Sequence, residues 1–494
     1  TIEATGTMLA GQGVEAMYTS IMNHDLLSVG LNCATGPEFM TDHLRSLAAI
    51  AKTRVSCIPN AGLPDSEGRY LETPDGIARV LERFVDLGWL NIVGGCCGTT
   101  YAHTAALAKM VRGKRPRVPQ VHHKTILSGI EFLEVADDNR PVLVGERTNV
   151  IGSRRFKRLI GEGAWEEASE IGSKQVKGGA QVVDVCLADP DRDEMADMLE
   201  FLPQLIKKVK APLMIDSTDA AVIASALTYC QGKAIINSVN LEDGEERFEA
   251  VLPLARSFGA AVVCGTIDED KEHGMAVTRQ RKLEVARRSY DLMTRKYGIP
   301  GEDILWDPLT FPCATGDAKY AGSAVETIEG IRLLKEAFPD TKTILGISNV
   351  SFGLPEAGRE ALNSVFLYHC TKAGLDLAIV NTEKLERYAS IPEEDRRLAE
   401  DLLWNRGSDI IARFAARYRE ARPKAAQDAK ALPLDERLAR AIIEGTKEGL
   451  IADLELKRAD TSPLDIINGP LMKGMDEVGR LFNANELIVA EVLQ

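Results

Sequence analysis

The middle of this 494-residue sequence repeats one pattern eight times, and that repetition constrains the fold more than any other feature. Short runs of branched apolar residues, typical of strands, alternate with charged amphipathic segments of helical length, such as WEEASEIGSKQVKGG. Continuous apolar strands suit a parallel sheet covered on both faces, and eight β-then-α units over about 265 residues fit a closed (β/α)8 barrel. The strand-like runs span residues 141–148, 180–186, 211–217, 234–240, 260–267, 304–310, 342–348 and 375–381.

A doubly wound open sheet is the alternative arrangement for repeated β-then-α units. Such sheets usually have fewer strands and a glycine-rich first turn. The sequence contains no GxGxxG fingerprint. We therefore predict an α/β fold with one complete TIM barrel in the middle of the chain.

The N-terminal stretch carries only three β-then-α units, with strands predicted over residues 26–33, 53–60 and 90–97. Three units cannot close a barrel, so we expect a partial TIM barrel whose remaining strands, about five, precede Thr1 in the full protein or are missing from the sequence. The sequence does not begin with Met and stops within an apparent helix, so we expect both ends to be internal to a longer protein.

Two stretches lose the alternating pattern, and we predict an ordered linker at 114–140 and a second linker at 421–433. Residues 434–494 show helical periodicity only, with a Gly-Pro break at 469–470, and are predicted to form a small helical bundle. The expected domains are the partial barrel with its linker, the complete barrel and the bundle, over residues 1–125, 126–410 and 430–494.

The composition excludes several classes of protein. A net charge of −14 argues against nucleic-acid binding, which concentrates positive charge. No apolar run approaches the roughly 18 residues of a membrane span, and the first residues do not resemble a signal peptide. Nine cysteines in so long a chain do not make a disulfide scaffold, so we expect a cytoplasmic protein with reduced thiols.

Three cysteines are candidates for a metal site. Cys33, Cys96 and Cys97 each follow a predicted strand, at the end where (β/α)8 enzymes place their active sites. Three thiolates suit zinc, with a fourth position open for a substrate. Free cysteines are also among the most buried residues, and spacing alone leaves the two interpretations even. The remaining cysteines are predicted to be structural: Cys57, Cys186, Cys230, Cys264, Cys313 and Cys370.

The motifs GLNC (30–33), PNAGLP (59–64) and NIVGGCCGTT (91–100) resemble the homocysteine-binding barrel of the cobalamin-dependent methionine synthase family. They also resemble betaine-type homocysteine methyltransferases. The resemblance implies that Cys33, Cys96 and Cys97 bind zinc, which activates the homocysteine thiol. Asn60 ends the intervening strand and is a candidate for the open zinc position, although an Asn before Ala-Gly is more often a turn residue.

Polar residues also follow the strands of the complete barrel. Carboxylate and amide acceptors around a concave mouth suit a ligand with several N–H donors along one edge, such as a reduced pterin. Asp216 alternatively caps the following helix, and Asp184 and Asp268 are more readily explained as loop or capping residues. Asn237 and Asn349 lie within apolar runs, where an unpaired amide is costly, so a function is the better explanation. The full set is Glu146, Asn149, Asp184, Asp216, Asn237, Asp268, Asp307 and Asn349.

The motifs VGERTNVIGS, IINSVN, DPL and GISNVSFGLP resemble the pterin-binding methyltransferase family, which is related in fold to dihydropteroate synthases. The resemblance implies that Asp307 and Asn237 hold the pterin edge, that Asp216 contacts the reduced ring, and that Asn349 lies by the methyl-bearing N5. Asn349 and Asp216 are thus the predicted catalytic residues. Glu146, Asn149 and Arg359 are predicted to complete the folate pocket. A dihydropteroate synthase would carry a basic Ser-Arg-Lys motif where this chain has Ser348-Asn349-Val350, which favours methyl transfer.

The tail motif IINGPLMKGMDEVGRLF resembles the helical cap over cobalamin in the same methionine synthase family. By motif position Phe482, and more weakly Val489, would shield the cobalt-bound methyl group. Apolar residues in a helical bundle are more often core than cofactor contacts. The resemblance implies that the cobalamin-binding domain and a reactivation domain lie C-terminal to this section.

Together these resemblances imply an enzyme that moves a methyl group from 5-methyltetrahydrofolate, via cobalamin as methylcobalamin, to zinc-bound homocysteine. One cobalamin would then visit two substrates in turn, so domain rearrangement is expected. Two alternatives remain: a folate:corrinoid-protein methyltransferase with a separate zinc module, and a non-catalytic scaffold that docks a corrinoid protein.

Overall fold

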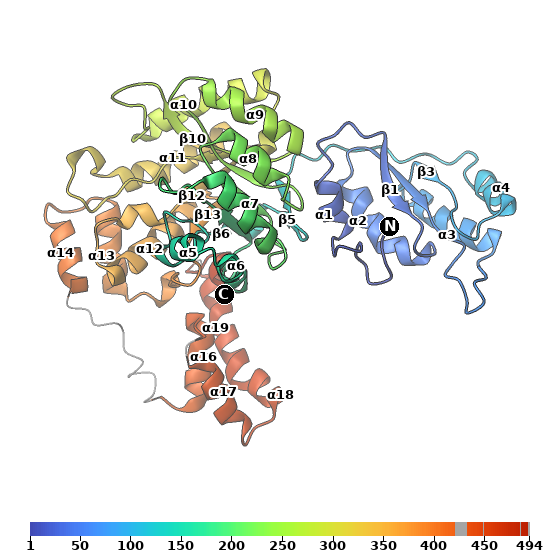
Figure 1. Ribbon diagram of the computed structural model, residues 1–494. Helices are drawn as coiled ribbons and strands as arrows, with labels where there is room; N and C mark the ends of the chain where they lie inside the picture. Colours follow the sequence, from blue (N-terminus) through green and yellow to red (C-terminus); the bar gives the residue numbers. More distant parts are fainter. Residues whose placement is uncertain (420–431, 448, 485, 493–494) are drawn as a thin grey trace.

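The computed structural model describes residues 1–419, 432–447, 449–484 and 486–492. Figure 1 shows three parts: an N-terminal unit, a central barrel and a helical tail that extends away from the barrel. None of the described helices is long and apolar enough to cross a membrane.

The central part is a closed barrel of eight parallel strands, as the repeated pattern predicts. The strands are β6 (Val142–Gly145), β7 (Val182–Val185), β8 (Leu213–Asp216), β9 (Ile235–Leu241), β10 (Ala261–Asp268), β11 (Ile304–Asp307), β12 (Lys342–Gly346) and β13 (Leu377–Val380). Each follows its neighbour in sequence, and β13 pairs with β6 to close the ring. The predicted TIM barrel is confirmed.

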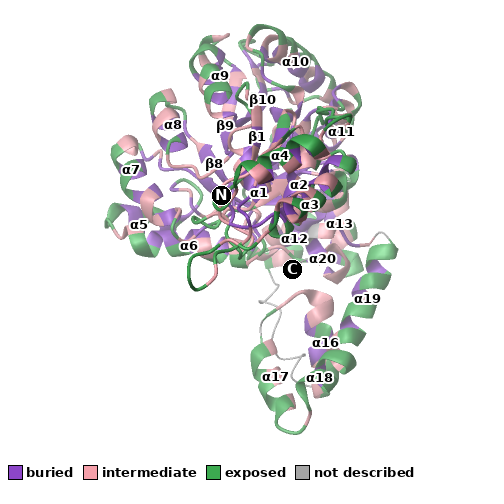
Figure 2. Cartoon of the chain, turned by 90° about the vertical axis from the view of Figure 1, so that its right-hand side faces the viewer, coloured by how far each residue is buried: buried purple, intermediate pink, exposed green. Residues whose placement is uncertain are grey.

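Helices surround this barrel, most of them packed against the strands, while α5 packs on α6 and α14 on α12 and α13. The helices are α5 (Arg154–Gly161), α6 (Trp165–Lys177), α7 (Glu194–Leu205), α8 (Ala220–Leu227), α9 (Glu246–Phe258), α10 (Arg279–Asp291), α11 (Ser323–Ala337), α12 (Glu356–Ala373), α13 (Glu393–Leu403) and α14 (Ile410–Arg419). Figure 2 shows their buried residues turned toward the strands and their exposed residues turned outward. Apolar side chains such as Val144, Met214 and Leu305 fill the barrel interior, so it is a packed core and not a channel.

The N-terminal unit has the three predicted strands, β1 (Ser28–Asn32), β2 (Arg54–Ile58) and β3 (Ile92–Val93), in one parallel sheet. Its helices are α1 (Val14–Thr19), α2 (Thr41–Ile50), α3 (Pro74–Asp86) and α4 (Tyr101–Met110). Leu44, Leu81 and Phe84 are fully buried in its core. The three-stranded unit therefore has its own apolar cluster.

The stretch 114–140, predicted as an ordered linker, also contains regular secondary structure that the sequence analysis did not identify. It contains a hairpin of two antiparallel strands, β4 (Ile126–Ser128) and β5 (Phe132–Glu134). Leu127 and Val135 join the apolar cluster inside the barrel, and the Ser128 N–H donates to the carbonyl of Lys233, two residues before β9. The hairpin therefore closes the end of the barrel at which the strands begin.

The N-terminal unit packs against this closed end, and Figure 1 shows β5 between the two parts. The Asn23 amide donates to the carbonyls of Arg256 and Ser257 at 3.1 and 3.0 Å. Lys52, just before β2, pairs with Glu302, just before β11, at 3.7 Å. Because the starts of both sets of strands meet here, their carboxyl ends point away from each other.

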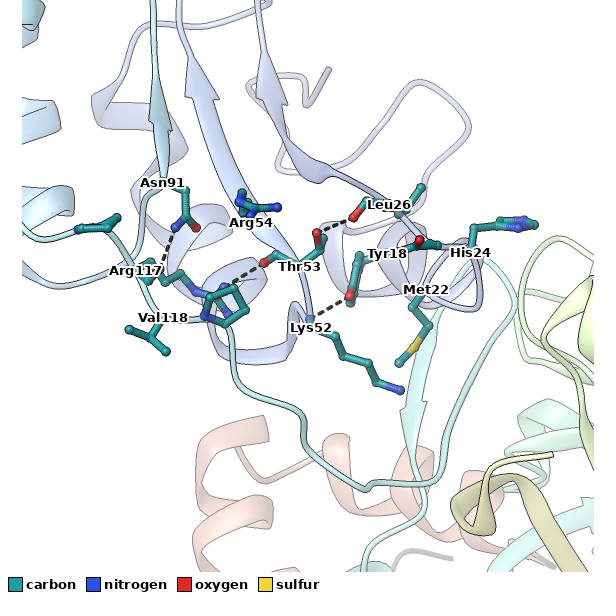
Figure 3. Close-up of a pocket in the computed structure, with 13 residues that line it drawn as sticks. Tyr18, Met22, His24, Leu26, Lys52, Thr53, Arg54, Asn91, Arg117 and Val118 are labelled. Atoms are coloured by element: carbon teal, nitrogen blue, oxygen red, sulfur yellow. Dashed lines mark hydrogen bonds between the residues drawn. The ribbon is translucent and has the colours of Figure 1, made fainter. Parts of the chain in front are cut away.

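A cavity of about 700 Å³ lies beside this junction (Figure 3). Lys52, Thr53, Arg54 and Arg117 line it at the start of β2. The Arg117 guanidinium is buried and donates to three backbone carbonyls, so it serves to hold the chain together there. The cavity is thus at the opposite end of the strands from the predicted metal ligands.

The tail is helical, as expected. It consists of α16 (Leu434–Glu444), α17 (Leu450–Arg458), α18 (Pro463–Ile466), α19 (Met472–Asn483) and α20 (Val489–Val492). A π-helical turn, Ile467–Leu471, carries the chain through Gly469-Pro470 into α19, so the predicted break is a local irregularity. The predicted linker at 421–433 lies mostly outside the described residues.

The tail is attached to the flank of the barrel. The Arg387 guanidinium donates to the carbonyls of Ile442 and Ile443 at the end of α16, both at 2.7 Å. The carboxylate of Glu491 accepts the Tyr388 N–H at 2.5 Å. Helix α20 also contacts a short turn, Asp137–Asn139, that precedes β6. The described part of the tail therefore docks on the flank of the barrel, where α20 reaches the segment just before β6.

Candidate functional site

The three candidate metal ligands come together at the carboxyl end of the N-terminal sheet. Cys33 directly follows β1, and Cys96 and Cys97 follow β3. The sulfur of Cys97 lies 3.7 Å from that of Cys33 and 3.9 Å from that of Cys96, and all three sulfurs lie within 4.8 Å of one another. Two sulfurs bound to a tetrahedral zinc at about 2.3 Å would be about 3.8 Å apart. The spacing of the thiols therefore fits zinc.

Asn60 lies beside the thiols and is buried, with 4% of its surface exposed. Its side-chain oxygen has no hydrogen-bond partner among the described residues. A buried oxygen without a partner is costly, and a bound cation would relieve that cost. The Asn60 oxygen thus suits a fourth ligand, whereas its backbone N–H, bonded to the Thr35 carbonyl, helps to shape the loop.

Local backbone geometry places the sulfurs. Cys33 and Ala34 both have positive φ, of 65° and 66°, which turns the chain sharply at the end of β1. The Cys96 N–H donates to the Pro59 carbonyl and the Ala61 N–H donates to the Cys97 carbonyl, both at 2.8 Å. A hydrogen bond from the Ala34 N–H is the main cause that lowers the pKa of Cys33, and hydrogen bonds with the neighbouring thiols lower it further. Of the other six cysteines, Cys57, Cys186, Cys264 and Cys370 are buried as predicted, and Cys230 and Cys313 are half-buried.

At the mouth of the barrel, the end where its strands terminate, one amide joins two carboxylates. The Asn149 side-chain nitrogen donates to Asp184 at 3.1 Å and to Asp216 at 3.4 Å. Its oxygen accepts the N–H groups of Ile151 and Gly152, which fixes the orientation of the amide. Burial raises the pKa of Asp216 to about 6 and that of Asp184 well above its usual value.

The structure separates Asp216 from the capping role that sequence left open. Helix α8 is capped by Asp219, whose carboxylate accepts the Ala221 and Val222 N–H groups. Asp216 instead ends β8 next to Asn237, which pairs with it in the strand register. One guanidinium nitrogen of Arg281 donates to both carboxylate oxygens of Asp268, at 2.7 and 2.6 Å. This ion pair supports the structural explanation for Asp268.

Glu146 and Arg359 approach the mouth from β6 and α12. The Ser348 hydroxyl donates to the Glu146 carboxylate at 3.4 Å, and the Arg359 guanidinium donates to the Ser348 carbonyl at 3.3 Å. Burial raises the pKa of Glu146. Ser348 thus connects the two predicted residues.

Asp307 ends β11 and Asn349 follows β12. The Asp307 carboxylate accepts the Leu309 N–H at 2.8 Å, and burial raises its pKa to about 6. The Asn349 amide donates to the Thr310 carbonyl at 2.5 Å. Its side chain is exposed, so the argument that a buried amide needs a partner was wrong for this residue. The reason is that β12 ends at Gly346 and Asn349 lies in the following 3-10 turn.

Three residues at the mouth were underrated or missed in the sequence. Asp184 is buried and one of its oxygens has no partner among the described residues, so it belongs with Asn149 and Asp216. Arg247 donates to the carbonyls of Ser217 and Ser238. Lys282 is fully buried close to Asp307. Both cations lie in charged helices where sequence cannot distinguish them from solvent-facing neighbours.

In the tail, Phe482 lies on α19 with 41% of its surface exposed, on the same side as the exposed Met475. Neither side chain is buried in the described part of the tail, and the role of Phe482 as a cofactor contact stays a prediction. Val489 begins α20, which packs against the barrel, and it is half-buried. The two residues predicted to shield cobalamin therefore lie on different helices.

Three family models match successive parts of the chain. Residues 1–111 match the homocysteine S-methyltransferase family, residues 145–381 the pterin binding enzymes and residues 434–494 the B12 binding domain. Among solved structures, dihydropteroate synthase from Xanthomonas albilineans in complex with 7,8-dihydropteroate is 16% identical, with a TM-score of 0.37, over 63% of this chain and 100% of that one. That likeness is too weak to support a functional assignment.

Two curated proteins are similar to this chain along its whole length, at a much higher sequence identity. Methionine synthase of Mycobacterium tuberculosis is 40% identical over 100% of this chain, and methionine synthase of Mycobacterium leprae is 38% identical over 100%. The chain spans 42% of the length of each of these relatives. With three matched modules in order and this identity along its whole length, the chain belongs to the methionine synthase family.

Proposed function

We propose that this chain forms the homocysteine-activating, folate-binding and cobalamin-capping parts of a methionine synthase, which transfers a methyl group from 5-methyltetrahydrofolate via cobalamin to homocysteine. The observation that carries the proposal is the pairing of two different strand-end sites in one chain. One holds three converging thiols, and the other holds amides and carboxylates around a barrel mouth.

Cys33, Cys96 and Cys97 would hold zinc, with the Asn60 oxygen in the fourth position until a substrate arrives. Zinc, when bound, lowers the pKa of a thiol and so supplies a thiolate at neutral pH. The protein's own contribution is to place the sulfurs at the right spacing before the metal binds, through the sharp turn at Cys33 and the backbone bonds of the neighbouring loops. Little reorganisation is then needed when zinc enters.

At the barrel mouth the carboxylates of Asp307 and Asp216 and the amide of Asn237 would accept the N–H donors of a pterin. Half-buried carboxylates with raised pKa values are poorly solvated, so a ligand that donates to them replaces the lost water. The amide of Asn149 would keep Asp184 and Asp216 in place. Glu146 and Arg359 would complete the pocket through Ser348.

Removing a methyl group from N5 places negative charge on that nitrogen unless a proton arrives. Asn349 would follow this change, because an amide can donate to a bare nitrogen or accept from a protonated one. One N–H of Asn349 is already held by the Thr310 carbonyl. Its oxygen and its second N–H remain for the ligand, which suits a residue that is preorganised but exposed.

Cobalamin, when bound, would accept the methyl group from folate and give it to homocysteine. The exposed apolar stripe of α19 with Phe482 is chemically suited to cover a corrin face. Since the carboxyl ends of the two strand sets point away from each other, the cobalamin-bearing part would have to move between them.

Separate half-reactions test this function in the full-length protein. Methyl transfer from 5-methyltetrahydrofolate to added cob(I)alamin reports on the barrel mouth, and methyl transfer from methylcobalamin to homocysteine reports on the thiols. We expect both to occur. Folate binding without either transfer would instead support a non-catalytic docking scaffold, and folate demethylation alone would support a folate:corrinoid-protein methyltransferase.

A further inference from the structure

Lys282 is the most unusual cation in the barrel. It lies on α10, and its side chain is completely buried. Its ammonium group donates to the carbonyls of Ala276 and Pro308, at 2.7 and 2.5 Å, and lies 5.2 Å from the centre of the Phe311 ring. No carboxylate among the described residues forms an ion pair with it. A buried lysine without such a partner is costly, so its position needs an explanation.

The carbonyl of Pro308 belongs to a short loop that starts at Asp307. Every carbonyl from 307 to 310 accepts a bond from a different side chain. The donors to Asp307, Pro308, Leu309 and Thr310 are, in that order, Thr266 at 3.2 Å, Lys282 at 2.5 Å, Thr327 at 2.8 Å and Asn349 at 2.5 Å. Leu309 has a φ of 62°, which a leucine adopts only when its surroundings hold it there. The loop is therefore held from several elements at once.

This loop connects the two residues that our proposed function uses most. Asp307 begins it, and Asn349 is bonded to its last carbonyl. A shift of the loop would therefore move two residues together: Asp307, the proposed acceptor for the pterin edge, and Asn349, the amide proposed to act at N5. Lys282 bonds the middle of the loop to the start of α10, and its charge acts on Asp307 from the protein side.

The neighbouring helix leaves room for Lys282. A methyl group added at Gly330 on α11 would lie 2.7 Å from the Lys282 Cδ atom. A parallel arrangement exists one barrel unit earlier. Arg247 on α9 donates to the carbonyl of Ser217, which follows Asp216, and to the carbonyl of Ser238, which follows Asn237. Cations from outer helices thus hold the residues next to three of the predicted folate ligands.

We propose that Lys282 is a positioning residue that fixes loop 307–310, and through it both Asp307 and Asn349, for folate binding and methyl transfer. The inference rests on the proposed function of the barrel mouth. Lys282 itself touches neither the pterin nor the transferred methyl group.

The test compares Lys282→Met with Lys233→Met in the full-length protein. Both lysines are buried in the same barrel, but Lys233 pairs with Asp303 at the strand-start end, far from the mouth. We expect Lys282→Met to weaken affinity for 5-methyltetrahydrofolate and to slow single-turnover transfer to added cob(I)alamin, each by about 10-fold to 100-fold. Lys233→Met should lower the melting temperature but leave the folate affinity and the transfer rate within about twofold of the wild-type values.

A second readout separates positioning from general stability. The pKa of Asp307 is raised by burial and lowered by the Leu309 N–H and by Lys282, while Lys282 also faces Glu326, which pairs with Arg279. Removing the charge of Lys282 should therefore move the pH at which folate affinity falls to a higher value. Lys233→Met should leave that pH unchanged.

Thr327→Val keeps the test valid if Lys282→Met does not fold, because it removes a single bond to the same loop. It should reduce transfer in the same direction with a smaller magnitude. The inference would be overturned if Lys282→Met kept the wild-type folate affinity and transfer rate and did not differ from Lys233→Met in either. Absence of folate binding in the wild type would overturn the proposed function itself.

Discussion

The thiol site and the barrel mouth both lie at the carboxyl ends of parallel strands, but the protein surrounds them very differently. Cys97 is exposed and Cys33 and Cys96 are only half-buried, so solvent reaches the sulfurs. At the barrel mouth, Asp184 is buried, and burial is the main cause that raises the pKa of Asp216 and Asp307 to about 6, with a further contribution from the charge of Glu194 at Asp216. In the proposed function, zinc would fix the protonation state of the thiols, whereas burial in the fold already shifts the pKa values of the carboxylates.

The two sites also differ in what holds them. Backbone bonds between loops place the sulfurs. Side chains from several outer helices hold the loops at the mouth, among them Arg247, Lys282 and Thr327. At the thiol site, substitutions of the metal ligands themselves should therefore have the large effects. At the barrel mouth, substitutions of the side chains that support the ligand-binding residues should also reduce activity.

The largest effect is expected at the thiols. Cys96→Ser or Cys97→Ser in the full-length protein should remove most of the bound zinc and abolish transfer to homocysteine, because a serine hydroxyl is a poor zinc ligand at neutral pH. Transfer from folate to cob(I)alamin should survive. Metal analysis gives the zinc content, and Cys57→Ala is a matched control at a buried cysteine of the same unit. Full zinc content in either serine variant would disprove the ligand assignment.

The next largest effect is expected at the barrel mouth, where Asn349 and Asp307 have different predicted roles. Asn349→Ala should lower single-turnover methyl transfer by about 10²–10³, because it removes a preorganised group that acts as charge develops on N5. Asp307→Ala should mainly weaken folate binding. Titration of folate affinity alongside single-turnover rates distinguishes the two. If the Asn349 variant kept its rate at saturating folate and lost only affinity, Asn349 would be a recognition group.

The hairpin gives a third, smaller effect, on folding. A fragment of residues 122–419 should fold alone and bind methyltetrahydrofolate, with a melting temperature that rises on ligand addition. A fragment starting at 141 lacks β4 and β5 and exposes the part of the barrel core that Leu127 and Val135 cover. Losing one buried Leu costs about 2–5 kcal/mol. Equal melting temperatures of the two fragments would show that the hairpin is dispensable.

The barrel and the thiol site were largely predictable because their signals are local. Each barrel strand is a continuous apolar run, and the three thiols and most of the predicted residues of the barrel mouth lie at the end of such a run or in the loop after it. The hairpin was not predictable, since its strands have three residues each and its pairing with the barrel end is long-range. Lys282 gave no signal, because it is one of five cations between residues 279 and 288 and only the fold turns it inward.

The smallest effect, and the sharpest contrast between the sites, concerns pH. Burial raises the pKa of Asp216 and Asp307 to about 6, from an ordinary value of 3.8. Between about pH 4 and 6 the folded barrel therefore binds more protons than the unfolded chain, so with respect to these groups its free energy of unfolding falls as pH rises through that window. Folate binding should run the opposite way, because the ionised carboxylates are the better acceptors for pterin N–H groups. We expect affinity to fall at least about tenfold from pH 7 to pH 5.

Calorimetric titration at several pH values measures this, and Asp307→Asn supplies the comparison. The amide keeps the shape of the carboxylate and one acceptor oxygen but cannot titrate, so affinity at pH 7 should fall while its dependence on pH becomes shallower. The residual slope then reports on Asp216, which keeps its buried position beside Asn149. A flat wild-type profile from pH 7 to pH 5 would contradict the raised pKa values. A slope unchanged in Asp307→Asn would assign the titration to another group at the mouth.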